Sequence, residues 1–514
     1  MIIVCTASSD TYITNKIINS NFMATDANVG RASTLDLFKL YDETELNGSG
    51  SQTELSRVLI KFDTSPISNL TSSVIDINSS KFKAFLKLYD ISSGRSTPSN
   101  FKLIVYPLSQ SFDEGVGRDV GSFNDLDAAN FITASYNNGT AITWFVTGAN
   151  SGGGAGTAQI DYITSGNFGN GFVDLFNTQN FVNGNEDLTI DVTKVISATI
   201  AGNMQNYGFR LSFSGTQETD NVTRFVKRFA SRHTSNPLLR PKIYVQYDDS
   251  IKDYENNFYF DTSGTLFLQS FNGSSYTNLV SGSALTPVTG LNCILLNLTT
   301  GSFNFTVTGS QHRAGTGNNF ITGLYSASFA LSSVDSAVVT GTETLDKFIA
   351  ASGSVTFDAY WKSIDGTFGY STGSLTVKRP VRNQGNFTSR RPLLNVTNAN
   401  PYYTANDVVR FRIFGVDLDQ QYTEPVKRPR IRKSEIFDKV YYQVIDRFSG
   451  AVVIPYDDVN NSTQVSIDNE GMFFDFYMQS LAPGRSYGFQ FYIKERGQTY
   501  ISREDETYFD VRTY

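Results

Sequence analysis

The side chains of this sequence that could take part in the most kinds of catalysis are two histidines, His233 and His312, and two cysteines, Cys5 and Cys293. A Ser-His-Asp triad needs a nucleophile, a base and an orienting acid, and no Gly-x-Ser-x-Gly motif supplies the nucleophile. Two thiols so far apart form neither a disulfide framework nor a four-ligand zinc site. We therefore predict no catalytic, cofactor-binding or metal-binding residues. We expect buried cysteines and a hydrogen-bonding role for His233 at a domain rim.

Carboxylate pairs offer a second kind of chemistry. Glycoside hydrolysis needs two carboxylates on facing elements, which adjacency in the sequence does not establish. The pairs Asp125/Asp127 and Asp417/Asp419 could offer oxygens to Ca²⁺, but neither lies in an EF-hand-like loop. We therefore expect all of the acidic pairs to lie in solvated loops. The pairs are Asp113/Glu114, Asp125/Asp127, Asp417/Asp419 and Asp457/Asp458.

The glycine-rich segment 148–156 reads GANSGGGAG. It lacks the Lys-Ser/Thr of a phosphate-binding loop and no helical pattern follows it, so we expect a flexible loop.

The densest charge lies in segment 427–433, which holds five basic residues in seven positions. Such a run could contact nucleic acid electrostatically. The chain as a whole carries a net charge of −7, which argues against general nucleic-acid binding. We therefore interpret the run as an arm that docks on an acidic partner subunit. Its basic residues are Lys427, Arg428, Arg430, Arg432 and Lys433.

The elements that position these residues are predicted to be β-strands. The 514 residues include 13% aromatics and only 18% charged residues, against ~25% in typical proteins. Apolar side chains alternate in segments 82–88, 207–213 and 487–493, which is typical of antiparallel strands with one wet face. One short helix is predicted at 191–202, capped by Asp191 or Thr193 and ended by Gly202.

The chain is too long for one core, and domains of about 100–200 residues predict roughly three. Polar segment 248–257 and the Pro-, Asn- and Arg-rich segment 380–400 separate strand-rich blocks. We predict domains at 1–249, 250–380 and 401–514, with an extended linker or arm at 381–400. No stretch approaches ~18 apolar residues, and the first residues lack secretory features, so we expect cytoplasmic synthesis without membrane insertion.

An ordered series of landmarks spans residues 7–247. The landmarks are Asp10–Ile13, Asn28–Arg31, Arg57–Asp63, Lys83–Tyr89, Val105–Leu108, Thr143–Trp144 with the Gly-rich 148–156, Asp191–Thr193, Asn206–Phe209, Phe229–Arg232 and Pro241–Tyr247. This series resembles the DNRLRE-type β-sandwich domain, a carbohydrate-binding-module-like family, and the resemblance implies a jelly-roll-like sandwich. Departures from the family pattern are Thr199 in place of a usual Trp, His233 in place of an acidic residue, and a long insertion between Phe112 and Thr140.

Two side chains of this region have expected structural roles. Asp63 can accept hydrogen bonds from the backbone of the turn at 64–66. Arg232 is expected to pair with a carboxylate at the sandwich rim, for which we consider Asp63.

The last block is similar to immunoglobulin or fibronectin type III domains. Leu481–Tyr487, followed by an alternating strand, is similar to the turn and tyrosine-bearing strand of that family, and 440–454 reads as paired strands. The middle block predicts another sandwich. The fold class is therefore all-β, with tandem β-sandwich domains, of which the first is jelly-roll-like and the last immunoglobulin-like.

Three classes of function compete. We favour a non-enzymatic structural protein of a bacteriophage virion, in the neck, collar, tail or fibre, that is made in the host cytoplasm. Its partners would be other virion proteins and further copies of itself. A cell-surface carbohydrate-binding or adhesion protein, with a surface glycan as ligand, is the alternative. A polysaccharide-active enzyme is the third class, and no catalytic motif in the sequence supports it.

Overall fold

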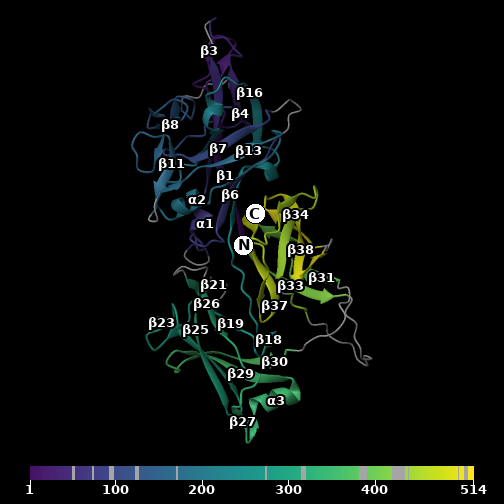
Figure 1. Cartoon of the computed structure of the whole chain (residues 1–514). Coiled ribbons are helices and arrows are strands. Elements are labelled where there is room, and N and C mark those ends of the chain that lie inside the picture. Colours follow the sequence, from purple (N-terminus) through teal and green to yellow (C-terminus); the bar gives the residue numbers. More distant parts are fainter. Residues whose placement is uncertain are drawn as a thin grey trace. The chain divides into compact units, whose positions relative to one another are not determined.

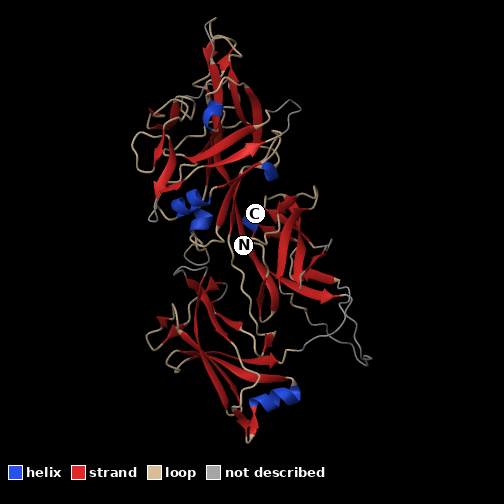
Figure 2. Ribbon diagram, viewed as in Figure 1, coloured by secondary structure: helices blue, strands red, loops and turns tan. Residues whose placement is uncertain are grey.

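The computed structural model describes most of the chain as β-strands joined by short loops (Figure 2). The predicted all-β fold class is confirmed. Within the described residues, no helix is both long and apolar enough to cross a membrane. The described ranges are 1–48, 52–71, 75–91, 98–121, 127–168, 172–272, 275–313, 320–380, 391–418, 434–437, 439–495, 497–502 and 507–513.

The chain forms two compact units. The first unit contains Ile2–Asn69 and Phe82–Gln246, and the second contains Met1, Leu70–Lys81 and Tyr247–Tyr514. The predicted segments 250–380 and 401–514 therefore belong to one unit, although each builds sheets of its own.

The first unit is a β-sandwich organised around strand β1 (Figure 1). Residues 2–6 of β1 pair with β17, and residues 7–14 pair with β5, with a bulge between Ala7 and Ser9. One strand thus belongs to both layers. The main strands are β1 (Ile2–Thr14), β4 (Thr34–Tyr41), β5 (Thr53–Phe62), β6 (Lys83–Leu88), β7 (Phe101–Pro107), β13 (Asn177–Phe181), β14 (Leu188–Asp191), β15 (Phe209–Phe213), β16 (Arg224–Ala230) and β17 (Lys242–Gln246).

Smaller elements complete this unit. The predicted helix is α2 (Thr193–Ile200), where the Asp191 carboxylate accepts the Thr193 N–H at 2.8 Å and Gly202 follows with a φ of 75°. The remaining elements are α1 (Ser65–Ser68), β2 (Ile17–Ile18), β3 (Phe22–Met23), β8 (Thr133–Asn137), β9 (Thr140–Thr143), β10 (Gly152–Gly154), β11 (Tyr162–Asn167), β12 (Phe172–Asp174) and two 3₁₀ turns, Gly215–Glu218 and Pro237–Leu239.

The predicted alternation holds in β6 but not in β15. In β6, Ala84, Leu86 and Leu88 are buried, while Lys83, Phe85 and Lys87 are only partly buried. In β15 every side chain is buried, including Arg210, so the predicted wet face is wrong there. The reason is a buried ion pair, because Arg210 and Arg57 both contact Glu218.

The middle part of the second unit is a seven-stranded sheet around one apolar core. Strand β25 pairs with β24 through its first residues and with β26 near its end, so the sheet continues past it on both sides. Helix α3 (Leu345–Ser352) packs against β29 and buries Leu345 and Ile349 (Figure 1). The sheet contains β18 (Phe258–Tyr259), β19 (Gly264–Gln269), β24 (Ile294–Thr300), β25 (Phe303–Arg313), β26 (Phe320–Phe329), β29 (Ser354–Ser363) and β30 (Gly369–Lys378), and the hairpins are β20 (Phe271–Asn272) with β21 (Ser275–Tyr276), β22 (Val280–Ser281) with β23 (Thr286–Pro287), and β27 (Val338–Thr340) with β28 (Glu343–Thr344).

The last part of the second unit is an immunoglobulin-like sandwich. The first sheet has the order β31-β33-β37-β36, which matches the ABED sheet of immunoglobulin domains. The second has the order β32-β40-β38-β34-β35, which contains the CFG order as β34, β38 and β40, with β35 and β32 added at its edges. The Tyr487 hydroxyl donates to the Ala482 carbonyl at 2.7 Å, the tyrosine corner of such domains. The strands are β31 (Pro392–Val396), β32 (Tyr402–Thr404), β33 (Val408–Asp417), β34 (Lys439–Asp446), β35 (Val452–Ile454), β36 (Ser466–Asp468), β37 (Gly471–Tyr477), β38 (Arg485–Glu495), β39 (Gln498–Ser502) and β40 (Tyr508–Arg512), with a 3₁₀ turn at Met478–Ser480.

This sandwich begins earlier in the chain than predicted. Residues 381–390 lie outside the described residues, but Pro392–Val396 of the predicted linker forms β31. The cause is its alternating pattern, because Leu394 and Val396 enter the core while Pro392 starts the strand at a sheet edge.

Candidate functional site

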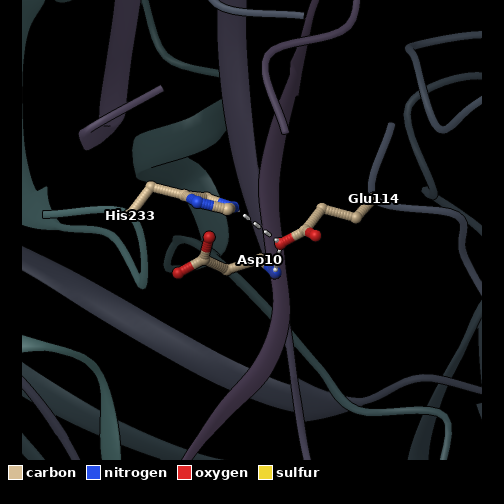
Figure 3. A group of neighbouring side chains, drawn as sticks. All are labelled: Asp10, Glu114 and His233. Atoms are coloured by element: carbon tan, nitrogen blue, oxygen red, sulfur yellow. Dashed lines mark hydrogen bonds and ion pairs between the residues drawn. The ribbon is translucent and has the colours of Figure 1, made fainter. Parts of the chain in front are cut away.

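Four ionisable side chains come together in the first unit. They are Asp10 of β1, Glu114 of the loop after β7, and Arg232 and His233 of the loop after β16. Figure 3 shows the Asp10 and Glu114 carboxylates on either side of the end of the His233 ring. Residues from three distant parts of the sequence thus form one cluster.

The bulge in β1 sets the position of Asp10. The strand changes its partner from β17 to β5 between Thr6 and Ala7, a bulge follows between Ala7 and Ser9, and Asp10 pairs with Ile60 of β5. A bulge bends the strand and redirects the side chains that follow it. The Asp10 side chain is 1% exposed although it is charged in its ordinary state.

Asn28 holds the loop that carries Glu114. Its amide donates to the carbonyls of Glu114 and Ala129, both at 2.8 Å, and its oxygen accepts the N–H groups of Gly30 and Gly117 at 3.0 Å. A Cβ atom on Gly30 would lie 1.9 Å from the Glu114 carbonyl oxygen, so this approach requires glycine. The Asn-x-Gly landmark of the sequence therefore positions Glu114.

A tight turn presents Arg232 and His233. The Ser231 hydroxyl donates to the Ala32 carbonyl and accepts the His233 N–H at 3.0 Å. The Arg232 N–H then donates to Oδ2 of Asp10 at 2.6 Å. The turn places both side chains over the same carboxylates.

The ionic contacts centre on Glu114. Nη1 of Arg232 lies 2.9 Å from Oε2 and 3.1 Å from Oε1, and the Asp10 N–H donates to Oε1 at 2.9 Å. Nε2 of His233 lies 3.5 Å from the same Oε1. Arg232 is 32% and His233 29% exposed, so solvent reaches the cluster from their side.

Asp10 is the strained member of the cluster. Burial raises the pKa of Asp10 to about 7; the Arg232 backbone N–H opposes this rise, and the negative charge of Glu114 adds to it. Oδ1 of Asp10 is buried and has no hydrogen-bond donor within reach among the described residues. A buried polar atom without a partner is costly, so this oxygen is suited to receive a cation or a proton.

The cluster offers metal ligands but lacks the order of a hydrolytic triad. One ligand atom from each of Asp10, Glu114 and His233 can be chosen so that the three lie within 4.8 Å of one another. The sequence analysis predicted no metal ligand, because the three residues are far apart in the chain. The one signal available was that the landmarks Asp10, Asn28 and Arg232 open and close the same predicted domain.

A cleft in the second unit holds another acidic group. Its volume is about 520 Å³, and Asp253, Glu255 and Asp468 line it. Burial raises the pKa of Asp253 to about 7, and the pKa of Glu255 also rises through burial and the nearby Asp468. Unlike Asp10, Asp253 accepts hydrogen bonds with both oxygens, from the N–H groups of Glu255 at 3.0 Å and Phe267 at 3.2 Å.

The predicted assembly contact cannot be placed next to either site. Lys427, Arg428, Arg430, Arg432 and Lys433 lie outside the described residues.

The expected pairing of Arg232 with Asp63 is wrong, because Arg232 pairs with Glu114. Asp63 instead accepts the Ser65 N–H at 2.9 Å and its hydroxyl at 2.6 Å, so its predicted role in the turn is confirmed. His233 lies at the partly exposed edge of the cluster, as expected. Cys5 is buried as predicted, whereas Cys293 is only partly buried.

Several predicted solvated carboxylates are buried instead. Asp417 accepts the Arg391 N–H, and Asp457 accepts N–H groups of the turn that follows it; each is 7% exposed. Asp125 and Asp419 lie outside the described residues, and Asp127 is exposed as predicted. Turn formation explains the error at Asp457, because a short acidic side chain can satisfy backbone N–H groups of the turn that follows it. At Asp417 the N–H comes from Arg391, 26 residues earlier in the chain, so tertiary structure decides its burial.

The glycine-rich segment is also more ordered than predicted. Gly152–Gly154 forms β10, which pairs in parallel with β11. At Gly148, with a φ of 79°, a Cβ atom would lie 2.4 Å from the Arg57 side chain, so close packing explains the glycine there.

Comparisons with known proteins leave the family open. No family model matches the chain. No curated protein matches its sequence significantly.

Three solved structures illustrate the range of matches. Fibronectin(III)-like modules of Clostridium thermocellum CbhA align over 51% of this chain and 90% of theirs, with 10% identity and a TM-score of 0.15. Trypsin-activated alpha-2-macroglobulin from Escherichia coli aligns over 91% of this chain and 23% of its own, with 10% identity and a TM-score of 0.17. A putative membrane anchored protein from Corynebacterium diphtheriae aligns over 100% and 97%, with 10% identity and a TM-score of 0.14. The immunoglobulin-like assignment of the last sandwich therefore rests on its strand order and tyrosine corner.

Proposed function

We propose that this chain is a non-enzymatic structural component of a bacteriophage virion, acting through protein–protein contacts in a neck, collar, tail or fibre. The observation that carries the proposal is the immunoglobulin-like sandwich of 392–512 at the end of an all-β chain. Such a sandwich is a rigid support whose loops are free to contact partners. The fold by itself does not determine the function, so the proposal needs a direct test.

The surface of this sandwich suits contact with other proteins. Phe448, in the turn between β34 and β35, is 79% exposed, and Val459 is 72% exposed. Their apolar area is available for burial against a partner, and aromatic side chains are enriched at protein interfaces. The partners proposed are other virion proteins and further copies of this chain, after synthesis in the host cytoplasm.

The first experiment is mass spectrometry of purified virions from the phage that carries this gene. The proposal expects the chain in the particle at a stoichiometry that fits a symmetric assembly. Its absence from purified particles that contain the other structural proteins would overturn the proposal.

The second experiment tests the basic run as an assembly contact. Changing its five basic residues to alanine should lower incorporation into virions without changing the thermal unfolding of the free protein. A control makes the same charge change at five exposed basic residues elsewhere and should leave incorporation unchanged. The control residues are Lys102, Lys194, Lys347, Lys378 and Arg379.

Carbohydrate binding is the second candidate, and an aromatic cluster on the first unit favours it. The ring centroids of Tyr106 and Tyr162 are 4.5 Å apart, and Phe176 lies 5.5 Å from Tyr106. Phe176 is 38% exposed, and both tyrosines are partly exposed. The rings are inclined to one another by 43° and 47°, and they offer apolar area with tyrosine hydroxyl groups, which suits contact with sugar rings.

Glycan-array binding by the full chain tests this candidate. Phe176→Ala and Tyr106→Ala should each reduce the signal at least five-fold. Phe225→Ala, at a 54% exposed position on β16, serves as the control. No glycan bound above background would remove the candidate.

A further inference from the structure

We propose that Asp10, Glu114 and His233 bind one divalent transition-metal ion of the zinc type. This site goes beyond the proposed structural function and does not depend on it. The three side chains can each present a ligand atom within 4.8 Å of the other two, and Figure 3 shows them converging on one region.

The buried oxygen of Asp10 is the independent observation. Oδ2 of Asp10 already accepts the Arg232 N–H, and both Glu114 oxygens have donors. Asp10 is 1% exposed, and no donor in the part of the chain that the structure describes reaches its Oδ1. A metal ion bound there would supply this atom with a partner.

The ligand set selects the class of metal. Two carboxylates and an imidazole are suited to zinc and its neighbours, whose sites commonly combine nitrogen and oxygen ligands. Calcium takes six to eight oxygen ligands, and magnesium keeps most of its waters, so neither needs a histidine. Three protein ligands leave a fourth position for water, on the side where His233 is 29% exposed.

Arg232 fits this assignment as a neighbour of the metal. Its guanidinium contacts both Glu114 oxygens, so it orients the carboxylate and neutralises part of its charge. With both carboxylates ionised and the imidazole neutral, the cluster including Arg232 carries a net charge of −1, which a divalent ion converts to +1. The site is therefore expected to bind zinc less tightly than a site without the arginine.

The bound ion would join three distant segments of the first unit. Asp10 lies in β1, Glu114 follows β7, and His233 follows β16. Ligands from such separated segments are close together only in the folded state, so binding stabilises the fold.

Isothermal titration of the metal-free full chain with ZnCl₂ at pH 8, where Asp10 is ionised, tests the proposal. One equivalent of zinc should bind saturably, and the unfolding temperature of the first unit should rise by about 5 °C in excess zinc. Asp10→Asn and His233→Gln should each weaken zinc binding at least ten-fold. His312→Gln, at the other histidine of the sequence, should change it less than two-fold.

Three results would overturn the assignment. They are no saturable zinc binding at pH 8, zinc binding that survives both ligand variants, or saturable binding of CaCl₂ in place of ZnCl₂. His233 is partly exposed, so His233→Gln keeps the test decisive if Asp10→Asn folds poorly. Far-ultraviolet circular dichroism of each variant in EDTA establishes that it is folded.

Discussion

Asp10 in the first unit and Asp253 in the second have similarly raised carboxyl pKa values but different hydrogen-bond partners. Burial raises the pKa of each carboxyl to about 7. Both oxygens of Asp253 accept backbone N–H groups, whereas one oxygen of Asp10 has no donor among the described residues. A shifted pKa alone therefore does not mark a ligand site. The unsatisfied oxygen and the adjacent imidazole distinguish Asp10.

The largest expected effect is on the pH dependence of stability. A carboxyl whose pKa is raised on folding binds its proton more tightly in the folded state, so its contribution to stability is complete below pH ~4 and is lost as the pH rises through 7. For Asp10 the loss is at most about 4 kcal/mol, at about 1.4 kcal/mol per pKa unit. Excess zinc should reverse this loss in the first unit only, since both Asp253 oxygens already accept N–H groups and no imidazole is among the residues that line its cleft.

Hydrogen exchange measured between pH 5 and pH 8, with EDTA and with zinc, checks this prediction. Protection of β1 reports on the first unit and protection of β19 on the second. Equal responses of both strands to zinc would contradict the comparison.

The second prediction compares Asp10→Asn with Asp253→Asn at pH 8 in EDTA. Both changes remove a buried charge, but only Asp253→Asn turns an amide N–H₂ toward a backbone N–H that had a carboxylate acceptor. The free energy of unfolding should therefore change more favourably, by about 1–3 kcal/mol, with Asp10→Asn than with Asp253→Asn. Urea unfolding of each variant measures the difference, and a more favourable Asp253→Asn would contradict the assignment of partners.

The third prediction concerns the ion pair of Arg232 and Glu114. Glu114→Gln should lower the stability of the first unit by no more than about 1 kcal/mol, because Arg232 is about one-third exposed and water screens the pair. The loss should shrink further in 1 M salt. Thermal unfolding at low and high salt measures both effects. A salt-independent loss of several kcal/mol would mean that the pair is buried.

The smallest effect is expected for Asp63→Asn. Ser65 holds the pKa of this carboxyl below its ordinary value through two hydrogen bonds, but the residue is exposed and does not contact Arg232. Asp63→Asn should shift the unfolding temperature by less than Glu114→Gln does, and zinc binding should not change. Weaker zinc binding in this variant would restore Asp63 as a member of the cluster.

Local patterns predicted the elements that position the site. The alternation in 82–88 and the helical pattern in 191–202 formed the predicted strand and helix, because apolar periodicity acts over a few residues. The predicted side-chain cap did not form, since Val192 is the N-cap residue. The all-β class follows from the same patterns. The prediction of a solvent-exposed face on β15 was wrong, because an ion pair with Glu218 allowed Arg210 to enter the interior.

The cluster itself could not be predicted from the sequence. Asp10, Glu114 and His233 follow no spacing rule, and Glu114 looked like half of a solvated acidic pair. The position of Glu114 depends on Asn28, which makes four hydrogen bonds, three of them to segments distant in the chain.

The sequence by itself determined the strand content, the short helix, the turn at Asp63 and the tyrosine of the last sandwich. These features depend on contacts between near neighbours in the chain. Only the tertiary structure decided which carboxylates are buried, which arginine neutralises Glu114, and that no donor among the described residues reaches one oxygen of Asp10. The physical reason is that burial and pairing depend on segments far apart in the chain, which only the folded sandwich brings together.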